Sequence, residues 1–84
     1  MESGAGLERF VLETLPGGRG RKSIDPDEDL LAGGVIDSVG LMEVVSFVEQ
    51  EYGIDVTDQD LVADNFRSLK SIQEFVELKR RGGT

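Results

Sequence analysis

Apolar residues recur at intervals of three and four positions in three segments of the 84-residue chain, a spacing that predicts amphipathic helices. The first helix should end at residues 16–18, Pro-Gly-Gly, and the second should cover about Ser38 to Tyr52, with Gly53 as its stop. The last should follow Ser68, a candidate N-cap, and stop at Gly82. The residues that form these three stripes are Leu7, Phe10, Val11, Thr14 and Leu15; Leu41, Val44, Val45, Val48 and Tyr52; and Leu69, Ile72, Phe75 and Val76.

The segments between these helices differ in character. The first connection, residues 17–37, starts with the flexible basic tract GGRGRK but then carries several apolar residues, which predicts a loop packed against the helices. Residues 54–57 alternate like a strand, but no second strand is available, so we expect an extended loop. Residues 58–67 should hold one or two short helical turns. The residues expected to point inward are Ile24, Leu30, Leu31, Val35 and Ile36 in the first loop, and Leu61, Val62 and Phe66 near the short turns.

These elements predict an all-α fold, a small four-helix bundle with three main helices, one short helix and a long first loop. The length suits a single domain over residues 1–84, with a core of about 5–81. Hydrophobic residues make up 38% of the chain and charged residues 31%, a soluble globular balance. The sequence has no apolar run long enough to span a bilayer and no signal-peptide pattern, so we expect a cytoplasmic protein.

Charge and cysteine content narrow the classes of partner and chemistry. The formal net charge of −8 disfavours binding to nucleic acid or to anionic lipid. The same charge would attract a basic protein partner. The alternative is that the acidic surface only makes the protein soluble. With no cysteine, the protein itself can form no disulfide framework and no zinc–thiolate site.

Two patterns resemble binding sites but lack residues that the chemistry requires. Asp25, Asp27 and Asp29 are spaced like the first ligands of an EF-hand calcium loop, but Leu30 and Ile36 occupy the positions of its glycine and its bidentate glutamate. We therefore expect no metal site. The glycines of the GGRG tract follow a helix rather than a strand and precede no GK[ST], so a flexible connection is expected there.

Catalysis by the chain itself is also disfavoured. Glu49 and Glu51 are two positions apart on a helix and point in different directions, so we expect them on the solvated surface. Ser38 follows Asp37 at the start of the second helix, but the chain has no histidine. An aspartate with a pKa of about 4 is a poor base for activating a serine. The residues therefore disfavour a self-contained hydrolase.

Two interpretations of Ser38 remain open at this point. In the first, Ser38 or Asp37 only caps the helix, since both residue types are favoured there. In the second, the serine is presented to another enzyme. A phosphate added to it would meet free N–H groups and the positive end of the helix dipole. The second interpretation gains support from an apolar residue, Val39, on the helix face that also carries Glu43, Ser46 and Gln50.

The stretch D-L-L-A-G-G-V-I-D-S-V-G-L-M-E-V-V-S-F-V-E-Q-E-Y-G-I-D-V resembles the central region of acyl carrier proteins. That family has a leucine-bearing loop, then G-x-(I/L)-D-S-(L), then an amphipathic helix ending in E-x-(F/Y)-(G/D). The resemblance extends from about Leu7 to Leu78. It implies that Ser38 receives the 4′-phosphopantetheine arm of coenzyme A from a separate transferase. Acyl or aminoacyl intermediates would then be carried on the arm as thioesters.

The resemblance also implies roles for other residues. Those that would contact partner enzymes are Asp37, Val39, Met42, Glu43 and Glu49. Those bordering the region where relatives shelter an acyl chain are Leu41, Val45, Phe47, Leu61, Val62 and Phe66. Departures from the family pattern are Val39 in place of leucine, Gly40 where an acidic residue is common, and Phe47 where fatty-acid carriers often have a small residue.

The cargo implied by these residues is small. Phe47 and Tyr52 add bulk that would fill the interior, and the segment A-D-N-F-R-S-L is similar to that of carriers for amino acids or small acids. A specialised pathway is therefore expected, making a polyketide, a nonribosomal peptide or a modified fatty acid. The implied partners of this monomer are a phosphopantetheinyl transferase, an acyl- or aminoacyl-activating ligase, and a downstream synthase or transferase with a basic docking patch.

Three alternatives stay open on the sequence alone. The chain could be such a carrier, a structural subunit of the same fold without acyl turnover, or a helical protein-interaction module in which Ser38 only caps. The carrier could be free-standing or a domain excised from a larger synthase.

Overall fold

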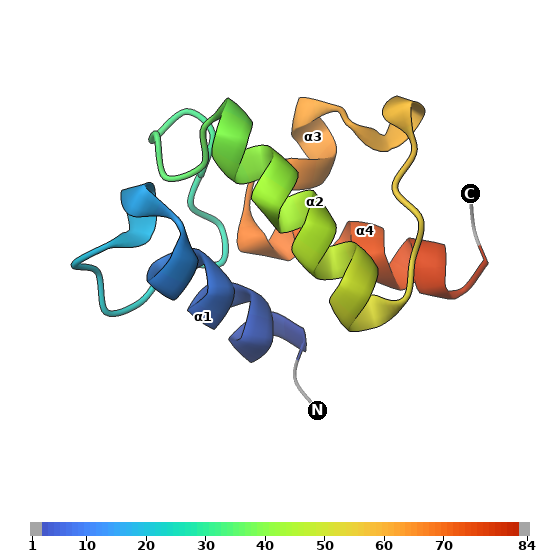
Figure 1. Cartoon of the computed structure of the whole chain (residues 1–84), viewed down its shortest axis with the longest axis horizontal. Helices are drawn as coiled ribbons and strands as arrows, with labels where there is room; N and C mark the ends of the chain where they lie inside the picture. The colour runs from blue at the N-terminus through green and yellow to red at the C-terminus, as the bar shows by residue number, and fades with distance from the viewer. Residues whose placement is uncertain (1–2, 83–84) are drawn as a thin grey trace.

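The computed structural model describes residues 3–82, and in that range the chain forms four α-helices, two 3-10 turns and no strand. The long first loop separates α1 from α2, and a shorter connection leads from α2 to α3 and α4 (Figure 1). This confirms the predicted all-α fold with its long first loop. The elements are α1 (Ser3–Thr14), η1 (Pro16–Gly18), α2 (Ser38–Tyr52), η2 (Asp58–Asp60), α3 (Ala63–Phe66) and α4 (Leu69–Arg80).

The helices begin and end where the sequence predicts. Gly53 follows α2 in the left-handed conformation, with φ of 67°, and its N–H donates to the carbonyl of Glu49. The Ser68 side chain caps α4 by accepting the N–H of Ser71 at 3.1 Å. Gly82, with φ of 83°, follows the last turn of α4. Capping and stop signals therefore set the boundaries of α2 and α4.

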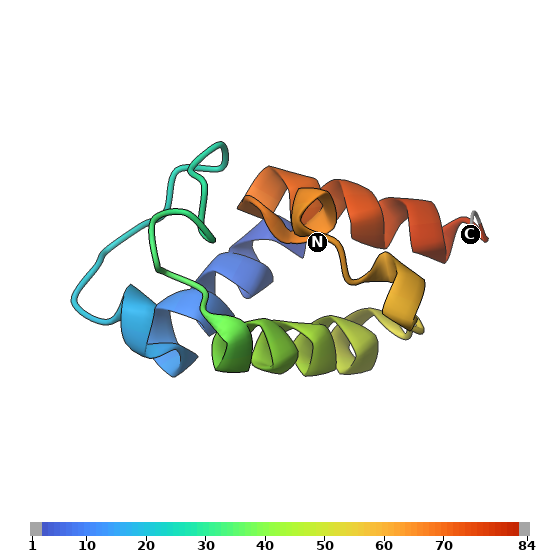
Figure 2. The same ribbon diagram turned by 90° about the horizontal axis from the view of Figure 1, so that it is seen from above.

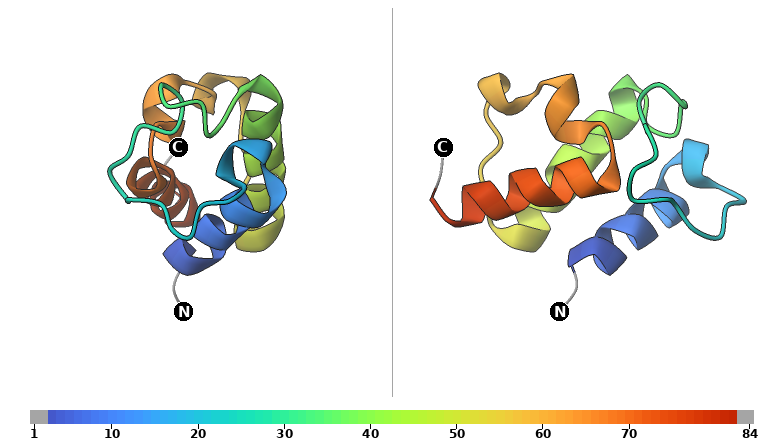
Figure 3. Two further views of the ribbon diagram at one scale, coloured as in Figure 1. Left: turned by 90° about the vertical axis from the view of Figure 1, so that its left-hand side faces the viewer. Right: turned by 180° about the vertical axis from the view of Figure 1, so that it is seen from behind.

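The core lies between the three long helices and the first loop. Figure 2 shows α2 and α4 on opposite sides, with the first loop at one end, and α1 contacts both helices. Seen from behind, α4 crosses in front of α2, and α3 lies above α4 (Figure 3). The buried side chains come from all three predicted stripes and from the loop, which confirms that the loop is packed: Leu7, Val11, Leu15, Ile24, Leu30, Val35, Ile36, Val44, Val45, Val48, Leu69, Ile72, Phe75 and Val76.

The region before α3 follows the prediction except at one residue. The predicted short turns are η2 and α3, Phe66 is fully buried, and Leu61 packs half-buried against the core. Val62, predicted to point inward, is 48% exposed. It precedes α3 in extended backbone, where successive side chains point to opposite sides. With Leu61 against the core, Val62 faces solvent, so the inward prediction for Val62 is wrong.

Two side chains hold the extended segment between α2 and α3. Glu49 is half-buried rather than solvated as predicted, because its Oε2 accepts the N–H of Val56 at 2.9 Å, a donor that has no strand partner in the described chain. Lys79 Nζ lies 2.8 Å from Asp60 Oδ2, and this pair is 13% and 18% exposed. The hydrogen bond from Lys79 is the largest cause that lowers the pKa of Asp60. Both contacts fasten this segment to the long helices.

Gly17 marks a close approach between the end of α1 and the loop that leads into α2. A Cβ at this position would lie 2.7 Å from the Cα of Val35 and 2.8 Å from the carbonyl oxygen of Gly34. Gly18 is buried against the backbone of Val11. The flexible connection predicted for these two glycines is therefore wrong, because their backbone packs directly against neighbouring backbone.

Gly17→Ala is expected to lower the free energy of unfolding by about 1–3 kcal/mol, because the added methyl group would force the loop backbone apart. Gly6→Ala is the matched control. Gly6 is exposed in α1 with no heavy atom near its Cβ position, so alanine there should stabilise the helix by about 0.5–1 kcal/mol. Urea denaturation measures both. Equal stability of the two variants would contradict the close approach.

Candidate functional site

The first turn of α2 is capped by Asp37 and not by Ser38. Asp37 is the N-cap, in extended backbone, and its Oδ1 accepts the N–H of Gly40 at 2.7 Å. The carbonyl of Asp37 accepts the N–H of Leu41, also at 2.7 Å. Ser38 is the first helical residue, exposed, and its side chain has no hydrogen-bond partner among residues 3–82. The interpretation in which Ser38 serves only as a cap is therefore wrong.

Ser38 lies at the edge of a shallow depression on the exposed face of α2. The depression has a volume of about 370 Å³ and is lined by Ser38, Val39, Met42, Glu43 and Ser46. Val39 is 71% exposed and Met42 is 56% exposed, which is high for apolar side chains. The structure thus gathers Val39, Met42 and Glu43, three of the residues predicted to contact partners, beside the serine.

The other two residues predicted to contact partners have structural contacts of their own. Asp37 holds the helix cap directly before Ser38. Glu49 lies near the far end of α2, half-buried, with one carboxylate oxygen occupied by the N–H of Val56. Glu43 is therefore the exposed carboxylate of the predicted set that borders the depression.

The six residues predicted to border an acyl chain differ in their contacts and in their burial. The Phe47 ring stacks on Phe10 of α1, with centroids 4.4 Å apart, and meets Tyr52 edge-on at 6.2 Å. The Phe66 ring packs against Phe75 of α4, with centroids 5.4 Å apart. Of the rest, Val45 is buried, Leu41 and Leu61 are half-buried, and Val62 is exposed. The bulk of Phe47 therefore lies between Phe10 of α1 and Tyr52 of α2.

Gly40 contributes to the site in a way that the sequence does not indicate. It is buried, and a Cβ at this position would lie 3.2 Å from Asp37 Oδ1 and 3.4 Å from Leu15 Cδ1. The missing side chain lets the first turn of α2 pack against the end of α1 beneath the cap. In the sequence, Gly40 was notable only as a departure from the family pattern and as a poor helix former inside a predicted helix.

Two of the three aspartates that are spaced like calcium ligands, Asp25 and Asp29, accept backbone hydrogen bonds within the chain. Asp25 Oδ1 accepts the N–H of Asp27 at 2.8 Å, and Asp29 Oδ1 accepts the N–H of Ala32 at 2.8 Å. Over residues 3–82, no group of three or more histidine, cysteine, aspartate or glutamate side chains is placed to hold a metal ion. The helices within the same range are too short or too polar to cross a membrane.

A model of one known protein family matches most of the chain. A family model described as the phosphopantetheine attachment site matches residues 18–78, which include the first loop, α2, α3 and most of α4. The chain belongs to this family. It is a phosphopantetheine carrier, a domain to which 4′-phosphopantetheine is covalently attached. No curated protein matches the chain.

The first turn of α2 fits a covalently attached phosphate of this kind. The carrier presents an exposed hydroxyl at Ser38, and the first N–H groups of a helix have no partner within the helix. Asp37 accepts the N–H of Gly40 through its side chain, which leaves the N–H groups of Ser38 and Val39 without a partner in the described part of the chain. Free N–H groups at the positive end of a helix dipole stabilise a phosphate.

Proposed function

We propose that Ser38 is the residue of this carrier that bears 4′-phosphopantetheine, in a single carrier domain over residues 1–84 with a core of about 5–81. The observation that supports this most is that Asp37, and not Ser38, caps the first turn of α2. Asp37 makes the capping hydrogen bond, so the Ser38 hydroxyl stays exposed and without a partner in the described chain. A separate transferase can therefore reach the hydroxyl and activate it.

The other serines within the matched residues suit the role less well. Ser68 is 7% exposed and caps α4, and Ser71 is hydrogen-bonded to it. Ser46 is exposed but lies in the middle of α2, where backbone N–H groups are engaged in the helix. Ser23 lies in the first loop, away from any helix start. Ser38 alone among these combines exposure with the first turn of a long helix.

We further propose that the chain carries acyl or aminoacyl groups for partner enzymes. When bound, the arm supplies a thiol that holds such groups as thioesters, a function that this cysteine-free chain cannot provide itself. The chain contributes the attachment serine and a recognition surface. The proposed partners are a phosphopantetheinyl transferase, an acyl- or aminoacyl-activating ligase, and a downstream synthase or transferase in a specialised biosynthetic pathway.

Incubation with coenzyme A and a broad-specificity phosphopantetheinyl transferase tests this function. Intact mass spectrometry should show conversion of the protein to a species heavier by one phosphopantetheine. An unchanged mass, with a known carrier converted in a parallel reaction, would contradict the proposal.

The surface beside Ser38 supports recognition by a partner with an apolar contact and a basic rim. Val39 and Met42 are exposed apolar side chains on the same face of α2 as Glu43. The chain has a net charge of −8, so it should attract such a partner electrostatically. Apolar contact would supply affinity, and Glu43 would supply charge complementarity.

Glu43→Lys is expected to reduce the efficiency of loading by the transferase at low salt, with the fold unchanged, because an exposed acidic contact becomes basic. The expected loss in loading efficiency is about tenfold or less, as expected when one exposed charge at the edge of an interface is changed. Glu74→Lys, an equal charge change at an exposed position of α4, is the matched control. Equal loading kinetics for Glu43→Lys and the wild type would argue against an electrostatic role for Glu43.

We propose that the cargo is an amino acid or a small acid. Val45 is buried and Phe66 is fully buried against Phe75, so the interior between α2, α3 and α4 is occupied by side chains. Close-packed interiors accept added volume only at a cost. Octanoyl and holo forms should therefore differ in NMR shift at the α2 surface near Ser38. Broad shifts at core residues such as Val48 and Ile72, as from an enclosed chain, would contradict the small-cargo proposal.

A further inference from the structure

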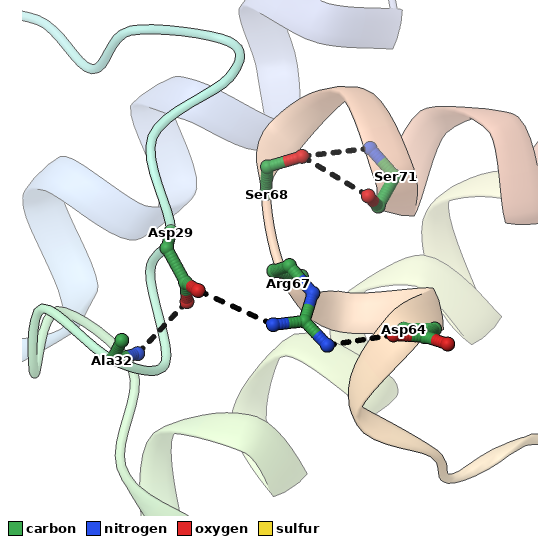
Figure 4. A network of polar contacts seen from close by, with 6 residues as sticks. All are labelled: Asp29, Ala32, Asp64, Arg67, Ser68 and Ser71. Atoms are coloured by element: carbon green, nitrogen blue, oxygen red, sulfur yellow. Dashed lines mark hydrogen bonds and ion pairs between the residues drawn. The ribbon is translucent and has the colours of Figure 1, made fainter.

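Arg67 connects the first loop to α3 through both halves of its guanidinium group. It lies in the short junction between α3 and α4. Its Nη1 donates to Asp29 Oδ2 of the loop at 3.3 Å, and its Nη2 donates to Asp64 Oδ1 of α3 at 2.6 Å (Figure 4). We call this three-residue contact the loop–α3 bridge.

The backbone continues this connection toward Ser38. The carbonyl of Arg67 accepts the N–H of Leu30 at 2.6 Å, and the Leu30 side chain is fully buried. The carbonyl of Leu30 in turn accepts the N–H of Ile36 at 3.1 Å. Ile36 directly precedes Asp37, the cap of α2, and Ser38. A continuous series of contacts therefore leads from the α3–α4 junction to the start of α2.

The bridge lies at the surface, so its role is not mainly to stabilise the fold. The side chains of Arg67, Asp29 and Asp64 are 48%, 37% and 86% exposed. Exposed ion pairs contribute little to stability. The N–H of Ala32 is the largest cause that lowers the pKa of Asp29, and the Arg67 guanidinium lowers it further, so Asp29 is charged near neutral pH.

We propose that Arg67 is a positioning residue for recognition of Ser38. By holding Asp29 and Leu30 against the α3–α4 junction, it keeps the start of α2 in one position relative to α3. An incoming enzyme then meets Ser38 and the exposed apolar residues Val39 and Met42 of α2 in one pre-arranged position relative to α3. This inference rests on the proposed role of Ser38.

The first arm of the test measures loading kinetics. Arg67→Ala should raise the KM of the transferase for the carrier about three- to tenfold with kcat unchanged, because the protein surface is less well arranged while the chemistry belongs to the transferase. Arg67→Lys should recover part of the loss, because the ammonium group keeps the positive charge but lacks the planar arrangement of donors of the guanidinium group. Arg81→Ala is the control, because it removes an exposed cation that lies 3.9 Å from Glu77 on α4, away from the loop.

The second arm measures amide hydrogen exchange in the unloaded protein and does not require that Ser38 be modified. In Arg67→Ala, the amides of Leu30 and Ile36 should exchange about three- to tenfold faster, while those of Val48 and Ile72 should be unchanged. Equal acceleration at all four amides, or none at Leu30 and Ile36, would overturn the positioning role.

The two arms separate failure of this inference from failure of the proposed function. If the wild type loads and Arg67→Ala has the same KM, or if Arg81→Ala raises KM equally, the positioning role of Arg67 is wrong. If the wild type does not load at all, the proposed function of Ser38 fails, and the exchange arm still decides whether the loop–α3 bridge orders the start of α2.

Discussion

Phe66→Ala is expected to lower the free energy of unfolding by about 3–5 kcal/mol, as measured by urea denaturation. The Phe66 side chain has no exposed surface, and its ring packs against that of Phe75 with centroids 5.4 Å apart. It is also the only buried residue of α3, a helix of four residues, which is too short to form without tertiary contacts. Alanine would leave a cavity and release α3 from α4.

The matched control for this prediction is Val62→Ala. Val62 lies directly before α3 but is 48% exposed, so its truncation should change stability by about 0.5 kcal/mol or less. A loss of similar size for Val62→Ala and Phe66→Ala would show that α3 is not anchored by the buried ring.

Ser38→Ala is expected to abolish attachment of phosphopantetheine completely while leaving the fold and its stability unchanged. The hydroxyl is exposed and has no hydrogen-bond partner among the described residues, and Asp37 makes the cap, so alanine removes no structural contact. It removes the oxygen that would form the phosphodiester bond. Intact mass after incubation with coenzyme A and transferase measures the effect.

Ser46→Ala is the control for the loss of a hydroxyl on the same face of α2, since Ser46 lines the same depression. It should load as the wild type does. A residual adduct on Ser38→Ala, or loss of loading in Ser46→Ala with its fold intact, would place the attachment site elsewhere.

Local signals predicted the helices well because each signal acts within one turn of its effect. The apolar period and the Gly53 stop define α2, which covers Ser38–Tyr52 as predicted. Ser68 caps α4 by a hydrogen bond to a residue three positions away. The apolar anchors of the first loop, such as Leu30 and Ile36, also predicted that the loop would pack against the core.

Features that depend on distant segments could not be predicted. The carboxylate of Glu49 accepts the N–H of Val56, which lies beyond the Gly53 turn that follows α2. Gly17 packs against Val35, eighteen positions later in the sequence. Arg67 contacts Asp29, 38 positions earlier. Periodicity describes one element at a time, so it carries no information on these pairs.

Only part of the candidate site could be predicted from the sequence. Serine and aspartate are both favoured as caps, so the sequence could not assign the cap to either Asp37 or Ser38. The geometry assigns it to Asp37. Helical spacing predicted that Val39 and Glu43 share a face, and Met42 was added only by the family resemblance. The placing of Gly40 against Leu15 required the position of α1.

The most direct test of attachment at Ser38 is to map the modification in the loaded protein by tandem mass spectrometry of its peptides. We predict that every modified molecule carries phosphopantetheine on Ser38. Phosphopantetheine on Ser46 or any other residue, or full loading with Ser38 unmodified, would contradict it.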